Sequence, residues 1–384
     1  MDIRFYFEPV DFSKHQNQGP LNWKHTLGAT IEKNTASLNP VNIRNLQVAI
    51  IGAPFNSSAK TSEISNIPDK IRAELYQLAN TGAKINIADF GNLKPAVSLK
   101  GNYQAIRDII DYFNELKVVT LVLGGSQDLT LGICEAFQND KFFSLTVIDS
   151  VLDIKKGRET TGAGNFLSSV FNSNPAIFQF NLVGYQSHLV PLAAFAKTQG
   201  INQHIRLGNI RDNVNNSEPV FRNSDVVSFD MSVLKLSEAP GTVYGTVNGL
   251  RSEEVCQLSK FAGLSNLVKS FGLFGIDPQK DQKTETLQLA AQIAWYFIEG
   301  FQNRDAGPDK TEELLSYQVH MKGVEYPVVF LKNPVTGQWW MEFETYDKKK
   351  LHFACTNDDY MKATDNEIPE IWMKFIQKID EIVK

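Results

Sequence analysis

The sequence predicts an α/β protein built on a parallel sheet, followed by a small C-terminal module of mixed α and β structure. Short apolar runs pass directly into glycine at residues 48–52 and 118–125, and this pattern is typical of strands buried on both faces. Amphipathic segments of helical period, such as residues 103–116, separate the runs, as the crossovers between parallel strands require. After residue 311 the pattern changes to a hairpin and one helix.

Length, charge and cysteine content narrow the class of protein. The 384 residues exceed one compact unit, so we expect a large core plus an appendage. The net charge of -5 argues against a nucleic-acid partner. Cys134, Cys256 and Cys355 are odd in number and widely spaced, which fits a reducing compartment. Without a leader pattern or a run of about 18 apolar residues, we expect a cytoplasmic protein with no membrane partner.

The chain divides into four segments. Residues 1–45 are mixed and polar, and we expect an irregular lead-in there. Residues 46–302 carry the predicted strands and helices of the α/β domain, which a helix at 284–301 closes. Residues 303–311, NRDAGPDKT, have the composition of a linker, and residues 312–384 form the small β-meander plus helix module.

Two aspartates mark the end of a buried strand in the middle of the α/β domain. Residues 143–148 form the apolar run, and Asp149 and Asp153 follow it. Asp230 similarly follows the apolar run at 226–229. Open α/β sheets place their chemistry at the carboxyl ends of strands, so these positions are the candidate site.

The segments around this site resemble those of the ureohydrolases, the arginase, agmatinase and formimidoylglutamase family. D-S-V-L-D at 149–153 is similar to the family signature D-A-H-x-D, and GGSQDLTLG at 124–132 is similar to GGDHSxxxG. SFDMSVLKLSEAPG at 228–241 is similar to SFDIDxxDPxxAPG, and FGIDPQKD at 274–281 to a last-strand motif EVNPxxD. The resemblance covers about residues 45–300. It implies a three-layer arginase-like fold with a parallel, mostly eight-stranded sheet between helices.

The resemblance also implies a set of metal positions, only half of which are kept. In the family two His and four Asp hold a manganese pair, whose bridging hydroxide attacks a guanidinium or formimino carbon. Three of the aspartates remain, and other residue types stand at the other three positions; the six are Gln127, Asp149, Val151, Asp153, Asp230 and Ser232. We therefore predict no bound manganese pair and no resident cofactor. Asn165 and Glu254 stand at family substrate-pocket positions.

Three carboxylates brought together need compensation, because like charges repel. A single Mg²⁺ or Ca²⁺ held by Asp149, Asp153 and Asp230, with further oxygens from Gln127, Ser150 or Asp128, is one possibility. A lysine lying over the pocket, Lys235 or Lys155, is another. In the third, the aspartates are partly exposed or satisfied by backbone N–H groups and water.

Two functions follow from these alternatives. The first is a non-catalytic binding or scaffold protein of the family, a pseudoenzyme that recruits a protein partner through its C-terminal module. The second is an active metal-dependent hydrolase that cleaves C–N bonds of a linear amidine of the formimidoylglutamate type in a rebuilt site. The resemblance further implies a homo-oligomer.

The tryptophans of the C-terminal module predict a contact. Trp339 and Trp340 are adjacent on a predicted strand, so their side chains point to opposite faces. The single predicted helix covers one face only. We therefore expect one indole to pack on the α/β body, on another subunit or on a partner, with the body or a subunit preferred.

Overall fold

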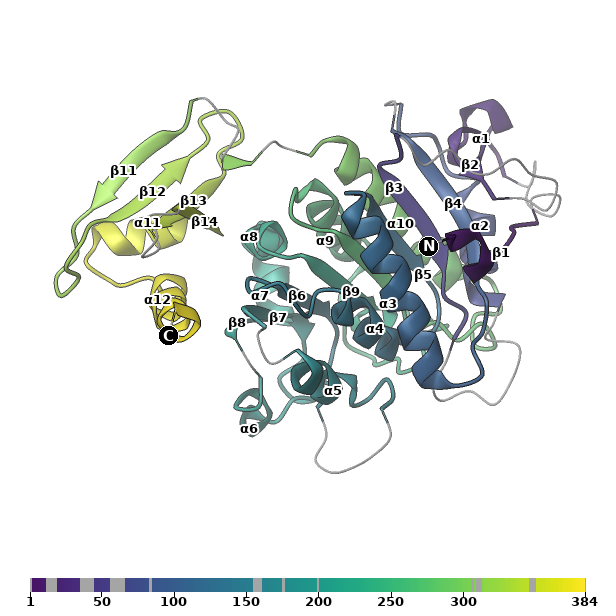
Figure 1. Ribbon diagram of the computed structural model, residues 1–384, viewed down its shortest axis with the longest axis horizontal. Coiled ribbons are helices and arrows are strands. Elements are labelled where there is room, and N and C mark those ends of the chain that lie inside the picture. Colours follow the sequence, from purple (N-terminus) through teal and green to yellow (C-terminus); the bar gives the residue numbers. More distant parts are fainter. Residues whose placement is uncertain are drawn as a thin grey trace.

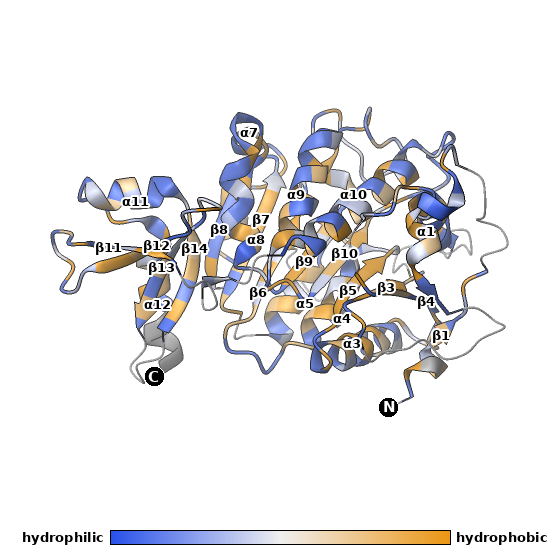
Figure 2. Cartoon of the chain, turned by 90° about the horizontal axis from the view of Figure 1, so that it is seen from above, coloured by the Kyte–Doolittle hydropathy of each residue, from blue (hydrophilic) through white to orange (hydrophobic). Residues whose placement is uncertain are grey.

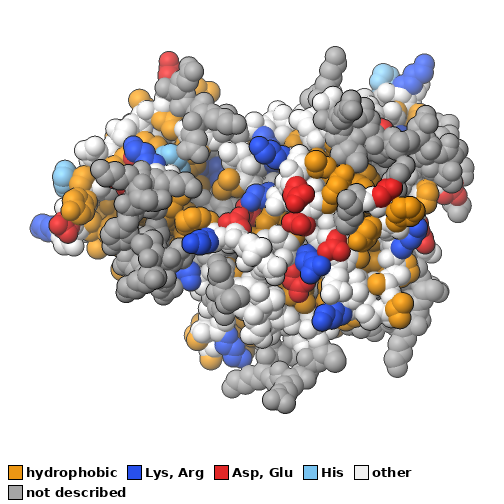
Figure 3. All heavy atoms as spheres, in the orientation of Figure 1, with side chains coloured by type: hydrophobic (Ala, Val, Ile, Leu, Met, Phe, Trp, Pro, Cys, Tyr) orange, Lys and Arg blue, Asp and Glu red, His pale blue; other side chains and the backbone are white. Residues whose placement is uncertain are grey.

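The computed structural model describes residues 2–11, 19–34, 45–55, 66–82, 85–154, 161–174, 177–198, 200–304, 307–308, 313–344 and 350–383. The chain forms a large α/β body and a smaller C-terminal module that lies beside it (Figure 1). None of the described helices is long and apolar enough to cross a membrane. On the face drawn in Figure 3, described Lys and Arg side chains are interspersed with Asp and Glu and form no broad basic field.

A mostly parallel sheet runs through the body. Its order is β1-β4-β3-β5-β10-β9-β6-β7-β8, with β2 also on β4. Besides the two-residue strand β2 (Glu32–Lys33), eight of the described strands run parallel, as the resemblance implied. They are β3 (Val48–Gly52), β4 (Ile87–Leu93), β5 (Val119–Leu123), β6 (Ser144–Ile148), β7 (Gln179–Tyr185), β8 (Ile201–Arg206), β9 (Val226–Asp230) and β10 (Ser270–Phe274).

Helices cover both faces of this sheet and complete three layers. One buried core includes residues of α2 (Ile67–Leu75), α7 (Leu207–Asp212), α8 (Glu218–Arg222), α9 (Ser252–Leu264) and α10 (Glu285–Gln302). The core on the opposite face includes residues of α3 (Leu99–Glu115), α4 (Thr130–Glu135) and α5 (Phe166–Ser173). Figure 2 shows α9 and α10 above the sheet and α3, α4 and α5 below it. Because every residue of β5, β6, β9 and β10 is buried, these strands are apolar without alternation.

The N-terminal lead-in differs from the irregular segment expected for residues 1–45. Two short strands in it, β1 (Phe7–Glu8) and β2 (Glu32–Lys33), both pair with β4. A short helix, α1 (Leu27–Thr30), lies between them. A strand of two residues is too short to show an alternation of apolar and polar side chains. The place of β1 and β2 in the sheet therefore follows only from their backbone pairing with β4.

The C-terminal module has a four-stranded antiparallel sheet and two helices. The predicted hairpin is present as β12 (Val328–Lys332) and β13 (Trp339–Glu344), and the predicted third strand as β14 (Lys350–Cys355). The structure adds β11 (Leu315–Val319) and α11 (Asn357–Thr364), which the sequence pattern did not predict. The predicted C-terminal helix is α12 (Glu370–Val383).

The module docks on the body through one of its two adjacent tryptophans, as expected. Trp339 stacks on Tyr360 inside the module, with ring centroids 4.7 Å apart. Trp340 points to the other face, where the guanidinium carbon of Arg222 in α8 lies 4.7 Å from the indole centroid. The prediction that one indole contacts the body is therefore confirmed.

Candidate functional site

The candidate site lies where neighbouring parallel strands end. Asp149 follows β6, and Asp230 is the last residue of β9, which pairs with β6. Gln127 begins the 3-10 turn Gln127–Leu129 after β5, which pairs with β10. These three side chains are deeply buried, with 1%, 1% and 7% exposure for Gln127, Asp149 and Asp230.

Ser232 links the two aspartates. Its hydroxyl donates a hydrogen bond to Asp149 Oδ1 over 3.0 Å, and its backbone N–H donates to Asp230 Oδ1 over 2.7 Å. Asp230 thereby caps the 3-10 turn Met231–Val233. The backbone N–H of Val151 also donates to Asp149 Oδ1, over 3.2 Å. Donors of the chain itself therefore reach the Oδ1 atom of each carboxyl group, in agreement with the third alternative considered above.

Burial favours the protonated form of both carboxyls. Burial raises the pKa of Asp149 well above its usual value, and the nearby Asp153 raises it further, while the donors from Val151 and Ser232 oppose the rise. Burial raises the pKa of Asp230 to about 7, with a further contribution from Asp149 and opposition from Ser232. A proton on one of these carboxyls would relieve the repulsion between them.

Gln127 replaces a family histidine and faces a serine. Its Nε2 donates to Ser228 Oγ over 3.2 Å, and Ser228 also bonds the Thr130 hydroxyl over 2.7 Å. The Oε1 atom of Gln127 is buried without a hydrogen-bond partner among the described residues. The adjacent Asp128 is turned toward other groups, since it accepts hydrogen bonds from Tyr103 and from Ser126.

Gly275 forms a wall of the site against Asp230. Its φ of +85° lies in the left-handed region, and a Cβ atom there would stand 2.3 Å from Asp230 Oδ1. A side chain at 275 would therefore clash with the carboxylate and strain the backbone. The resemblance implies Glu at this position in the family. The sequence shows Gly275 there but not its contact with Asp230, which only the structure reveals.

The two candidate substrate-pocket residues have local hydrogen-bonding roles. Asn165 precedes α5, and its Oδ1 accepts from the Gly162 N–H over 2.8 Å. Glu254 lies in the first turn of α9, where its Oε2 accepts from the Arg251 N–H over 2.8 Å. Both side chains therefore help to order the backbone that leads into a helix.

Lys235 does not compensate the aspartates. Among the residues that the structure describes, no ion pair joins Lys235 to Asp149 or Asp230, and no cation contributes to the pKa of either carboxyl. The backbone after β9 bonds instead to another loop, because the Lys235 N–H donates to the Leu250 carbonyl. The other lysine considered, Lys155, lies outside the described residues.

The residues at the family metal positions do not fit a manganese pair. Val151 has no donor atom, and Gln127 presents an amide where an imidazole is needed. The Ser232 hydroxyl already donates a hydrogen bond to Asp149. In the described part of the chain, no three His, Cys, Asp or Glu side chains are gathered so that they could hold a metal ion.

The fold and the strand-end carboxyls define a three-layer α/β protein of the ureohydrolase type. Residues 46–299 match the model of the Arginase family, and the chain belongs to this family. A formimidoylglutamase of Salmonella schwarzengrund is 20% identical over 268 residues, which span 65% of this chain and 84% of the relative. The predicted family membership is thus confirmed, and the C-terminal module lies beyond the matched residues.

Solved structures agree with this fold. The formimidoylglutamase of Bacillus subtilis aligns with a TM-score of 0.64 at 18% identity and covers 75% of this chain and 96% of that one. The formiminoglutamase of Trypanosoma cruzi with Mn²⁺ aligns with a TM-score of 0.62 at 17% identity and covers 70% and 97% of the two chains.

Proposed function

We propose that this arginase-family protein has lost the dimanganese site and serves as a non-catalytic binding or scaffold protein. The observation that carries the proposal is the position of Ser232 between Asp149 and Asp230, where it donates one hydrogen bond to each. In a hydrolase of this type the metals would make water nucleophilic. Here burial favours the protonated form of the same carboxyls, which also accept hydrogen bonds from the chain, and a metal would have to displace both the protons and these bonds.

The second function is an active hydrolase of a linear amidine in a rebuilt site. The formimidoylglutamases among the relatives favour it over other hydrolases of the family. It needs a metal bound by Asp149, Asp153 and Asp230 without an imidazole ligand at 127 or 151. Carboxylate oxygens suit Mg²⁺, Ca²⁺ or Mn²⁺, so this alternative is separated from the first by measured metal content.

The test is elemental analysis of the full-length protein after incubation with excess Mn²⁺ and desalting. We expect less than about 0.1 Mn per chain, because half of the ligand positions lack a suitable donor. The Bacillus subtilis formimidoylglutamase, treated in parallel, is the positive control. About two Mn per chain, together with hydrolysis of formimidoylglutamate, would overturn the proposal and establish the hydrolase.

A further inference from the structure

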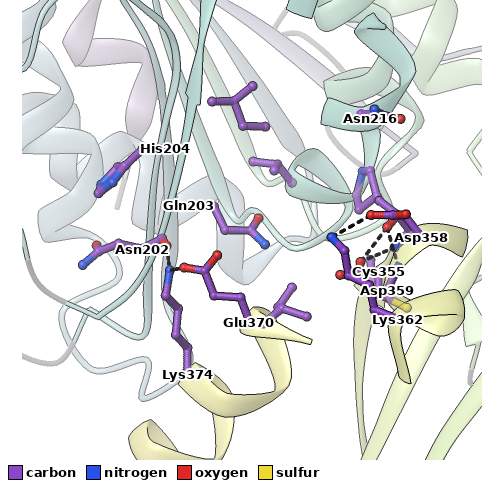
Figure 4. Close-up of a pocket in the computed structure, with 16 residues that line it drawn as sticks. Asn202, Gln203, His204, Asn216, Cys355, Asp358, Asp359, Lys362, Glu370 and Lys374 are labelled. Carbon is purple, nitrogen blue, oxygen red and sulfur yellow. Dashed lines mark hydrogen bonds and ion pairs between the residues drawn. The ribbon is translucent and has the colours of Figure 1, made fainter. Parts of the chain in front are cut away.

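A groove lies between the α/β body and the C-terminal module. It has a volume of about 780 Å³ and is lined by β8 and α8 of the body and by β14, α11 and α12 of the module (Figure 4). A smaller hollow of about 380 Å³ shares His204, Ile205 and Asn216 with it and continues along the body. The two hollows therefore adjoin, and we call them together the trough.

Direct contacts hold the walls of this groove in place. Asn223, which follows α8, bonds both backbone groups of Ala354 in β14: its Nδ2 donates to the carbonyl over 2.9 Å, and its Oδ1 accepts from the N–H over 2.8 Å. Arg222 donates to the Trp339 carbonyl over 3.1 Å. At the other end, Lys374 of α12 donates to the Asn202 carbonyl in β8 over 2.7 Å. The groove is therefore largely preformed, which lowers the entropic cost of binding.

The walls of the groove carry more acid than base. Asp358, Asp359 and Glu370 line it together with Lys362 and Lys374. Both lysines are already neutralised on their own helices, Lys362 by Asp358 over 2.7 Å and Lys374 by Glu370. The third carboxylate, Asp359, accepts hydrogen bonds from the Thr356 N–H over 2.8 Å and from its hydroxyl over 2.7 Å, and its charge adds to that of Asp358 beside Lys362. The lining therefore carries one acidic side chain more than basic ones.

The groups next to these residues do not reverse the excess of acidic over basic side chains in the groove. Burial lowers the pKa of His204 to about 4, and Lys374 lowers it as well, so the imidazole is neutral at physiological pH. The adjoining hollow adds Asp212 and no lysine or arginine. Complementary charge on the ligand would therefore be positive.

Gln203 gives the groove a group that can bind a peptide backbone. Figure 4 shows its side chain pointing from β8 into the groove, and no described residue forms a hydrogen bond with it. A carboxamide offers a donor and an acceptor side by side, which match the C=O and N–H of an extended chain. The protein uses this match next to the groove, where Asn223 bonds both backbone groups of the lining residue Ala354.

Apolar side chains complete the surface on which a chain could lie. Ile205 of β8, Val220 of α8 and Ile371 of α12 line the groove between the polar groups. Lysine and arginine side chains bury their methylene stems on apolar surface while their charged ends reach carboxylates. The trough thus suits alternating basic side chains on an extended backbone.

We infer that the groove between β8 and the C-terminal module binds an extended, lysine- or arginine-bearing peptide segment of a partner protein. This inference supplies a class of partner for the proposed binding role and rests on it. The peptide-binding inference and the proposed loss of the dimanganese site can fail separately. The groove residues are distinct from Asp149, Asp230 and Ser232, so a measurement of manganese content does not test peptide binding.

The test measures binding of fluorescein-labelled peptides to the full chain by fluorescence polarisation at low salt. The probes are a decapeptide of alternating Lys and Ser, the same peptide with Glu in place of Lys, and spermine as an unlabelled competitor. We expect the Lys peptide to bind at least about 10-fold more tightly than the Glu peptide. We expect the double variant Asp212→Asn, Asp359→Asn, and separately Gln203→Ala, to weaken binding of the Lys peptide at least about 5-fold.

The matched control is Asp111→Asn with Glu253→Gln, which removes two exposed carboxylates from α3 and α9 of the body. Equal loss in this control would show a general charge effect and overturn the inference. Equal affinity for the Lys and Glu peptides would overturn it too. In another outcome, spermine displaces the labelled Lys peptide at a molar concentration equal to that of the unlabelled peptide, while Gln203→Ala leaves peptide affinity unchanged. This result would assign the groove to small polyamines and overturn the inference of a peptide ligand.

Discussion

The carboxylate of Asp230 occupies the space in which a side chain of residue 275 would stand. A Cβ on Gly275 would lie 2.3 Å from Asp230 Oδ1 and 2.7 Å from Oδ2. The absence of a side chain at 275 therefore leaves the space that the Asp230 carboxyl fills. The carboxyl packs against the bare backbone and bonds the Ser232 N–H.

Gly275→Ala should be strongly destabilising. The positive φ and the contact with Asp230 act together, so we expect a loss of about 2–4 kcal/mol in the free energy of unfolding. The control is Gly323→Ala, which has a similar φ of +82° and open space around the added Cβ. It should cost only about 1 kcal/mol. Equal losses in denaturant titrations of the two variants would show that Asp230 does not crowd residue 275.

The triple variant Gln127→His, Val151→His, Ser232→Asp should take up Mn²⁺. It restores the three missing family ligands around Asp149, Asp153 and Asp230. Without metal it should be less stable than the parent, because Asp149 loses the Ser232 hydroxyl and gains a like charge nearby. Added Mn²⁺ should then raise the melting temperature of the variant and leave that of the parent unchanged. A folded variant that neither binds nor responds to Mn²⁺ would show that the pocket geometry is also lost.

Stability should fall as the pH rises from about 4 to about 7. The pKa of Asp230 is about 7 in the folded chain and about 3.9 when unfolded, so the folded state binds more protons in this interval. The stabilisation is complete below the unfolded pKa and is lost as the pH passes through the folded one. The effect is on the order of a few kcal/mol.

The comparison that isolates Asp230 uses Asp230→Asn, which cannot titrate. Urea unfolding of parent and variant at several pH values between 4.5 and 8 should give a steeper decline for the parent. Parallel curves would mean that Asp230 is ionised throughout the interval. Asp149 acts in the same direction, so the variant should retain part of the slope.

Asn223→Ala should loosen the C-terminal module. It removes both hydrogen bonds to Ala354 and leaves these backbone groups at the sheet edge without their partner, at a cost of about 1–3 kcal/mol. Hydrogen exchange at the Ala354 amide should accelerate, while exchange in β6 and β9 stays unchanged. The exposed Asn139→Ala is the matched control. Unchanged protection at Ala354 would show that the remaining contacts hold the module without Asn223.

Truncation after Arg304 tests the module as a whole. Removing it exposes Phe178, whose ring packs against Phe353 and Phe375, and leaves Arg222 without Trp340. We expect a lower melting temperature or self-association of the truncated body in solution-mass measurements, because apolar surface and a sheet edge become accessible. Unchanged stability and mass would show that docking contributes nothing to the body.

The sequence by itself determined the parallel sheet and the family, and it predicts a broken ligand set. These features are local: an apolar run ending in glycine predicts a buried strand, and Val151 lacks a ligand atom in any fold. It also determined that Trp339 and Trp340 face opposite ways, because side chains alternate along a strand. Of the alternatives that the sequence left open, compensation by Lys235 has no ion pair with Asp149 or Asp230 among the described residues, because a lysine near a motif in sequence need not face it in space.

The tertiary structure alone decided how the aspartates are satisfied and where the module sits. Ser232 and Asp149 are 83 residues apart, and Asn223 and Ala354 are 131 apart. Their hydrogen bonds depend on which strands become neighbours and on the depth at which each strand ends. The pairing of β1 and β2 with β4 and the contact between Gly275 and Asp230 depend on the same packing. Strand order and burial are properties of the whole core, so no local pattern in the sequence records them.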